Sequence, residues 1–170
     1  LNGYTSKDLA RIEQNCQSTI SSRGINFKVY SADKKAAEEK KWPLDIIPRI
    51  ITAQDWTQLE KGLKQRVLAL NLFIRDLYND QKIIKDKIIP KELVESSPGF
   101  LAPCQGLNPT HGTFCHISGV DLVRHANGQL YVLEDNLRIP SGVSYVLENR
   151  AVMKRTFPQL FDGLSVRPIE

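Results

Sequence analysis

Two runs of strand-forming residues joined by Asn127-Gly128 constrain the fold of this chain more than any other feature. This dipeptide is the strongest short-range signal for a β-hairpin with a two-residue type I′ turn. With Asn127 and Gly128 as the central residues of the turn, Asp121 is predicted to lie directly opposite Glu134. Like charges in such a pair repel each other. The two carboxylates therefore need a cation between them or a raised pKa on one of them.

The alternation of side chains along a strand adds a third oxygen to this pair. Successive side chains point to opposite faces, so Asn136 is predicted to share a face with Glu134, and Asp135 to point the other way. Carboxylate and amide oxygens suit a hard cation, and Mg²⁺ usually takes one or two protein carboxylates together with phosphate oxygens and water. The alternative is an exposed hairpin whose acids simply face water.

The sequence around the second strand favours a metal site over that alternative. Residues 130–133 are almost wholly apolar, so this strand is predicted to be buried on both faces. Pro140, Ser141 and Gly142 then open a helical pattern with Ser141 as its N-cap, and a helix N-terminus attracts anions. Arg138 lies between the ligands and that helix. Together these features predict a site that takes phosphate and carboxylate groups.

This region resembles the metal-binding end of the ATP-grasp ligases, in which an aspartate on one strand and Glu-x-Asn on the next hold Mg²⁺ against the phosphates of ATP. The chain is more closely similar to the circularly permuted ATP-grasp family, the relatives of glutathionylspermidine synthase, over most of residues 24–160. The residues that carry the resemblance are Asp121, Glu134 to Asn136 and Pro140 to Gly142, with the segments 42–49, 62–66 and 147–150.

The resemblance implies an α+β fold: an ATP-grasp-like lobe with an antiparallel hairpin or sheet packed by helices, as a fragment of a larger permuted ATP-grasp protein. It implies ATP and Mg²⁺ as cofactors and Arg138 as a catalytic residue near the phosphates or an acyl phosphate. Ser141 and Gly142 are expected to bind the cofactor through the helix N-terminus. The implied metal ligands are Asp121, Glu134 and Asn136.

One position departs from the family pattern. Glutathionylspermidine synthases carry an arginine two residues before the metal aspartate, and here that position is Gly119. Arg138 or Arg124 is a candidate to take its place.

The implied function is that of an ATP- and Mg²⁺-dependent ligase, which joins a carboxylate to an amine or thiol through an acyl phosphate on an amino acid or peptide-like substrate. Its partners are expected to be small-molecule carboxylates and amines. The alternative is a non-catalytic binding or scaffold module that retains the fold. The adenine pocket is expected beyond residue 170, so the full-length protein is expected to be the enzyme and this chain alone to be inactive.

Composition bounds the other classes of function. The 170 residues, 41% of them hydrophobic, are enough for one domain spanning residues 1–170: an N-terminal helix in 1–23, a family-like core in 24–160 and a tail in 161–170. The net charge is +4, and the densest charged run, residues 33–41, mixes both signs. A solvated loop or helical turn is therefore expected there rather than a surface for nucleic acid.

Membrane and redox signals point to a cytoplasmic protein. The longest apolar run, residues 67–74, is too short to span a bilayer, so no membrane partner is expected. The three cysteines have no metal-like spacing and indicate reduced thiols.

Two helices and a strand are predicted ahead of the hairpin. The first helix begins at Ser6 and ends at Arg23-Gly24, and a strand covers residues 25–30. Thr52 is predicted to cap the second helix, whose C-terminal half is apolar nearly all round and is expected at the centre of the core. Lys64 and Arg66 on this helix are expected to be solvated.

Overall fold

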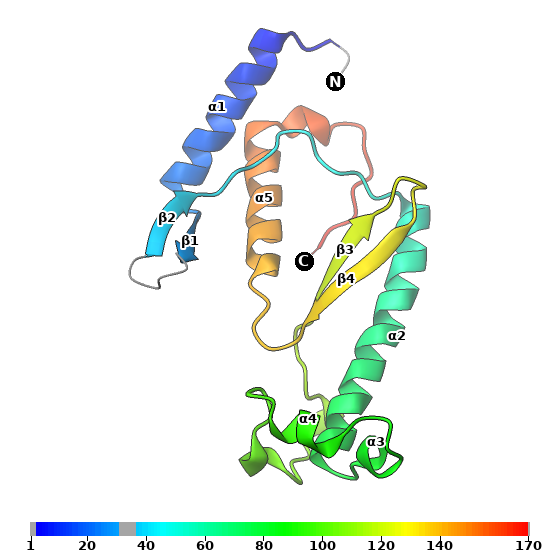
Figure 1. Ribbon diagram of the computed structural model, residues 1–170. Coiled ribbons are helices and arrows are strands. Elements are labelled where there is room, and N and C mark those ends of the chain that lie inside the picture. The colour runs from blue at the N-terminus through cyan, green and yellow to red at the C-terminus, as the bar shows by residue number, and fades with distance from the viewer. Residues whose placement is uncertain (1–2, 31–36, 170) are drawn as a thin grey trace. The chain divides into compact units, whose positions relative to one another are not determined.

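The computed structural model describes residues 3–30 and 37–169. The chain forms two compact units: unit 1 comprises Leu1–Ile50 with Ser141–Glu170, and unit 2 comprises Ile51–Pro140. Helices accompany a two-stranded antiparallel sheet in each unit (Figure 1), which confirms the predicted α+β class. The predicted single domain over 1–170 stays a prediction.

Unit 1 begins with helix α1 (Ser6–Ser22), as the sequence predicts. Thr5 caps it in a reciprocal arrangement: the Thr5 hydroxyl accepts from the backbone N–H of Asp8, and the Asp8 carboxylate accepts from the backbone N–H of Thr5. Gly24 follows the helix with a φ of +66°, a conformation that glycine adopts at little cost. Both predicted ends of the helix are confirmed.

The sheet of unit 1 pairs β1 (Asn26–Tyr30) with β2 (Ala37–Lys41). The strand predicted at 25–30 is confirmed. The loop or helical turn predicted for 33–41 is wrong for 37–41, and residues 33–36 lie outside the described residues. Backbone pairing with β1 outweighs the low strand propensity of this charged run, and Glu39 accepts a hydrogen bond from the Asn26 amide at 3.0 Å. The expected solvation holds, because residues 38–41 are exposed.

Helix α5 (Gly142–Thr156) packs against α1 to form the core of unit 1 (Figure 1). The Cys16 thiol and the Thr156 hydroxyl lie 2.8 Å apart and link the two helices inside this core. The helix leads into a short 3₁₀ turn, Pro158–Leu160. The buried residues of the cluster are Ile12, Cys16, Ile20, Ile46, Val152, Met153 and Phe157.

Trp42 joins the extended segment after β2 to α5. Its ring stacks on Tyr145 with centroids 4.1 Å apart, and its indole N–H donates to the Asn149 side chain at 2.8 Å. The neighbouring Glu148 forms an ion pair with Arg23. Several residues that carry the family resemblance, Trp42, Glu148 and Asn149, therefore hold this unit together.

Unit 2 begins with helix α2 (Ala53–Tyr78), capped by Thr52 as predicted. The prediction that its C-terminal half lies in the core is wrong: none of residues 53–78 is buried, and Leu68 is 60% exposed. The described part of unit 2 leaves the apolar side chains of α2 half-buried or exposed. Short elements follow: α3 (Lys82–Lys85), α4 (Lys91–Glu95), and the 3₁₀ turns Ala102–Cys104 and Thr110–Gly112.

Asn71 explains why a polar residue interrupts the apolar stretch of α2. Its amide nitrogen donates to the carbonyl of Gly112 at 2.8 Å. Its amide oxygen accepts from the backbone N–H of Phe114 at 2.9 Å and of Cys115 at 3.2 Å. One side chain thus satisfies three backbone groups of the segment that leads into the hairpin.

We expect Asn71→Leu to loosen this segment, because it leaves three partly buried backbone groups without partners, at a cost of about 1–3 kcal/mol each where they stay dry. Native-state hydrogen exchange should then be faster at the amides of Phe114 and Cys115. Gln65→Leu makes a similar replacement at an exposed position of the same helix and should leave those rates unchanged. Equal protection in both variants would contradict this role for Asn71.

Candidate metal centre

The hairpin of unit 2 pairs β3 (Gly119–Arg124) with β4 (Leu130–Asn136) in antiparallel fashion. Asp121 lies directly opposite Glu134, and Gly119 opposite Asn136. The predicted facing of the two carboxylates is confirmed. Figure 1 shows the hairpin lying along α2.

The turn that produces this register is not the predicted one. The backbone N–H of Gly128 donates to the carbonyl of His125 at 2.9 Å, and His125 pairs with Gln129. Gly128 has a φ of +86°, but Asn127 does not have the positive φ that a type I′ turn requires. This is a three-residue turn, a type I turn followed by a left-handed glycine.

A β-bulge at Leu133 restores the pairing. The three-residue turn shifts the register by one, so that Leu122 pairs with Val132 rather than with Leu133. Leu133 is then left without a partner on β3, and beyond it Asp121 pairs with Glu134. The two departures cancel, which is why a wrong turn type led to the right pair of carboxylates.

Glu134 and Asn136 share one face of β4, as predicted. The amide nitrogen of Asn136 donates to Glu134 Oε1 at 3.1 Å, which leaves the amide oxygen available as a ligand. Asp121, Glu134 and Asn136 are all exposed. In the described residues, neither carboxylate has an ion-pair partner. Two opposed, unneutralised carboxylates beside an amide oxygen fit a hard divalent cation.

The surroundings of these ligands differ from the expectation. The prediction that residues 130–133 are buried on both faces is wrong: Tyr131 is 49% and Leu133 72% exposed. The described chain covers one face of this hairpin. Among the described residues no three His, Cys, Asp or Glu side chains cluster, so the candidate centre consists of two carboxylates and an amide on an open surface.

Asp135 points to the other side and anchors β4 to α2. Arg66 donates from Nε to Asp135 Oδ1 at 2.8 Å and from Nη2 to Oδ2, a two-pronged contact between residues 69 apart in sequence. Arg66 is exposed, as predicted, but the sequence did not predict that its guanidinium pairs with Asp135. The Arg66 hydrogen bond lowers the pKa of Asp135, and the same bond raises the pKa of Arg66. Lys64 instead pairs with Glu60 on its own helix.

Gly119 cannot be replaced by the arginine of the glutathionylspermidine synthases without rearrangement. A Cβ at this position would lie 2.7 Å from the Cβ of Pro140. Arg124 is engaged at the turn end of β3, where it donates to Asp55 at 3.2 Å and to the carbonyl of Gly128 at 2.9 Å. Of the two candidates for the missing arginine, Arg138 is the one that makes no such contacts with the described residues.

Arg138 lies in a bend two residues after β4 ends at Asn136. It is exposed, and within 3–30 and 37–169 no hydrogen bond or ion pair engages it. Ser141 and Gly142 belong to unit 1. Ser141 is the N-cap position of α5 as predicted, but its side chain makes no capping hydrogen bond. The structure therefore brings together the three predicted metal ligands, whereas the roles of Arg138, Ser141 and Gly142 stay predictions.

The hairpin lies in a region of the chain that matches a known protein family. The family model for circularly permuted ATP-grasp type 2 matches residues 48–170. The chain belongs to the circularly permuted ATP-grasp family. The matched region contains the hairpin, its α2 anchor and all of α5.

Relatives of this ATP-grasp chain are considerably longer. An uncharacterized protein of Synechocystis sp. is 51% identical over 162 residues, which cover 95% of this chain and 33% of the relative. An uncharacterized protein of Mycobacterium tuberculosis is 45% identical over 148 residues, covering 87% of the chain and 26% of the relative. A Frankia casuarinae protein named a putative glutamate–cysteine ligase is 39% identical over 138 residues, covering 81% and 15%. The chain thus spans a third or less of these relatives.

No helix in the described part of the chain is long and apolar enough to cross a membrane.

The Asp135–Arg66 contact gives a pH-dependent prediction. The folded pKa of Asp135 lies below its unfolded value, so the contact stabilises the fold above about pH 4 and is lost as the pH falls through the folded pKa. Asp135→Asn should therefore unfold at a lower urea concentration than the parent at pH 7, and the difference should shrink as the pH falls below about 4. Asp162→Asn is the matched control at an exposed aspartate. A difference independent of pH would contradict this origin.

Proposed function

We propose that the whole protein is an ATP- and Mg²⁺-dependent ligase that joins a small-molecule carboxylate to an amine or thiol. In this reaction a carboxylate oxygen attacks the γ-phosphorus of ATP, ADP leaves, and an acyl phosphate forms. The amine or thiol then attacks the carbonyl carbon and inorganic phosphate leaves. A cytoplasmic setting is part of the proposal, supported by the free thiols of all three cysteines.

The facing of Asp121 and Glu134 across the hairpin is the observation that carries the proposal. Directly opposite side chains of an antiparallel pair have Cβ atoms about 4.5–5.5 Å apart, so the two carboxylates can share one cation. The Asn136 amide is oriented by its hydrogen bond to Glu134 and offers its oxygen to the same face. Bound Mg²⁺ would supply charge neutralisation for the transferring phosphoryl group.

We assign Arg138 to the transferring phosphate. It lies close in sequence to the ligand strand and has no ion-pair or hydrogen-bond partner in the described chain. The alternative is that Arg138 forms an ion pair with Asp135. The structure does not favour it, because Asp135 pairs with Arg66. An unengaged guanidinium is suited to oxyanions. Ser141 and Gly142 would hold a carboxylate or phosphate through the open backbone N–H groups that begin α5.

The substrate class rests on the relatives. The Frankia protein is named for glutamate and cysteine, an amino-acid carboxylate and an amino-acid amine, which agrees with the amino acid or peptide-like substrate expected from the family. We therefore propose an amino acid or short peptide as the acyl donor.

Glu134→Gln tests the metal assignment. It keeps the size of the side chain and removes one of the two opposed charges, so the whole protein should keep its melting temperature and lose amino-acid-dependent ATP hydrolysis by about 10²-fold or more, by comparison with the loss of single charge-stabilising groups in other enzymes. Glu92→Gln, at an exposed glutamate of α4, is the control and should be fully active.

Full turnover by Glu134→Gln would remove Glu134 from the metal site. If the parent protein shows no ATP hydrolysis with any pair of amino acids or peptides, the non-catalytic binding or scaffold module is the better description.

Arg138→Ala separates a chemical from a structural role. Since Arg138 is exposed and makes no hydrogen bond or ion pair with the described chain, the variant should melt within about one degree of the parent while kcat falls roughly 10²–10³-fold. A lower melting temperature with unchanged kcat would make Arg138 structural, and the phosphate role would pass to another residue.

A further inference from the structure

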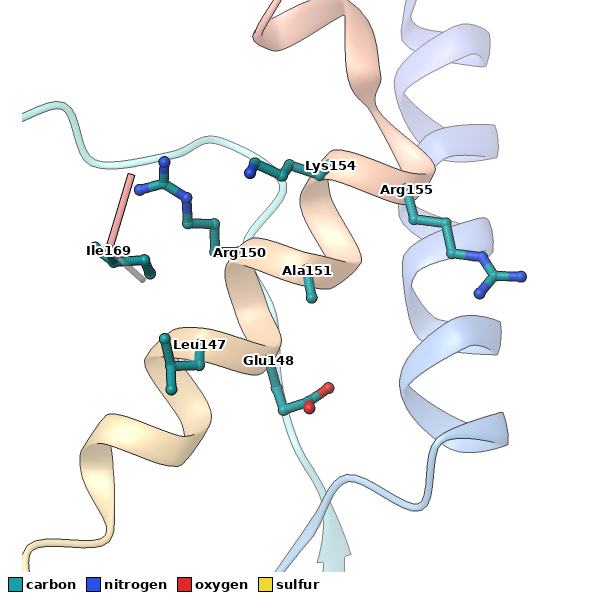
Figure 2. Close-up of a pocket in the computed structure, with 7 residues that line it drawn as sticks. All are labelled: Leu147, Glu148, Arg150, Ala151, Lys154, Arg155 and Ile169. Carbon is teal, nitrogen blue, oxygen red and sulfur yellow. The ribbon is translucent and has the colours of Figure 1, made fainter. Parts of the chain in front are cut away.

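A second group of charges, which have no ion-pair partner among the described residues, lies in unit 1 on helix α5. A hollow of about 490 Å³ runs along this helix, and three of the residues that line it are cations (Figure 2). Its lining consists of Leu147, Glu148, Arg150, Ala151, Lys154, Arg155 and Ile169.

The acid in the lining does not neutralise these cations. Glu148 pairs with Arg23 of the segment after α1, at 2.6 Å. Arg150 and Lys154 are four residues apart and project to the same side of α5, toward Ile169, whereas Arg155 projects to the opposite side (Figure 2). Like charges at this spacing repel each other along a helix, so the pair is unfavourable unless an anion lies between them.

Arg150 is held in place with donors to spare. Its Nη2 donates to the carbonyl of Arg167 at 2.7 Å. Its Nε is shielded from solvent and has no acceptor among the described residues. Shielded donors in proteins nearly always have a partner, and this one adjoins the hollow.

The helix dipole alone explains two of these three cations. Lys154 and Arg155 lie in the last turn of α5, where cations are favoured by the negative end of the helix dipole. That explanation does not reach Arg150, which lies more than a turn before the end at Thr156. Arg150 also takes no part in the contacts of α5 with Arg23 and Trp42, which Glu148 and Asn149 make.

We propose that Arg150 and Lys154 bind the oxyanion group, phosphate or carboxylate, of a small organic molecule. The planar guanidinium can hold two oxygens and the ammonium a third. The volume lies within the range of small-molecule sites, about 300–1,000 Å³, and exceeds what an inorganic ion needs. Leu147, Ala151 and Ile169 give the hollow an apolar wall, which suits an uncharged body on the ligand. The site does not depend on the proposed ligase reaction.

Inorganic phosphate is the first probe, added to the ¹⁵N-labelled chain at constant ionic strength. The Arg150 Nε–H resonance should shift with saturation. Lys154→Gln should weaken binding by about tenfold or more, since it removes one of the two charges, and Arg150→Gln should abolish the saturable response of the neighbouring backbone amides. Lys7→Gln makes the same change of charge at an exposed position of α1 outside the lining and should bind as the parent does.

Succinate distinguishes the two oxyanions: saturation by phosphate alone indicates a phosphate ligand, and saturation by succinate alone a carboxylate ligand. Lys154 is exposed and makes no hydrogen bond or ion pair with the described chain, so its variant stays informative if Arg150→Gln unfolds. Three results would overturn the site: no saturation by either anion, an equal response to chloride, or equal weakening by Lys7→Gln.

Discussion

The contact between Arg66 and Asp135 fixes the orientation on which the candidate centre depends. It ties β4 to α2 by a two-pronged charged hydrogen bond. Because side chains alternate along a strand, holding Asp135 against the helix turns Glu134 and Asn136 to the opposite, open face. A single hydrogen bond from Arg124 to Asp55 ties β3 to α2 near the turn. The orientation of the face that carries the candidate ligands is therefore fixed by contacts on the opposite face of the hairpin. The residues that make those contacts are not candidate metal ligands.

Local chemistry made much of this arrangement predictable. The ends of α1, the cap of α2, the hairpin, the facing of Asp121 and Glu134 and the start of α5 all follow from signals within a few residues of each other. The facing was reached through the wrong turn, because Asn-Gly fits both a two-residue turn and the start of a three-residue one, and the bulge at Leu133 has no signature of its own in a run of apolar residues.

The long-range contacts could not be predicted from the sequence. No sequence signal near Arg66 indicates an ion pair with a residue 69 positions away. No signal near Asn71 indicates that its side chain forms hydrogen bonds with three backbone groups. The apolar stretch of α2 and the strand 130–133 were both expected to be buried, since apolar composition was taken to mean burial. In unit 2 as described, Val94 is the one buried residue. A hydrophobic pattern shows which surfaces are suited to burial. In the described chain, buried apolar residues lie mainly in unit 1.

The bulge at Leu133 gives the hairpin a tolerance that a regular ladder lacks. A two-residue turn without a bulge and the observed three-residue turn with one need the same number of residues between Asp121 and Glu134. The two arrangements exchange the faces of residues 130–133 but leave the carboxylates opposed. Substitutions at the tip can therefore be absorbed before they reach the end of the hairpin that carries the charges. Substitutions in the turn can therefore leave the facing of the two carboxylates unchanged. A different residue at position 127 in a relative does not indicate that the relative has lost the carboxylate pair.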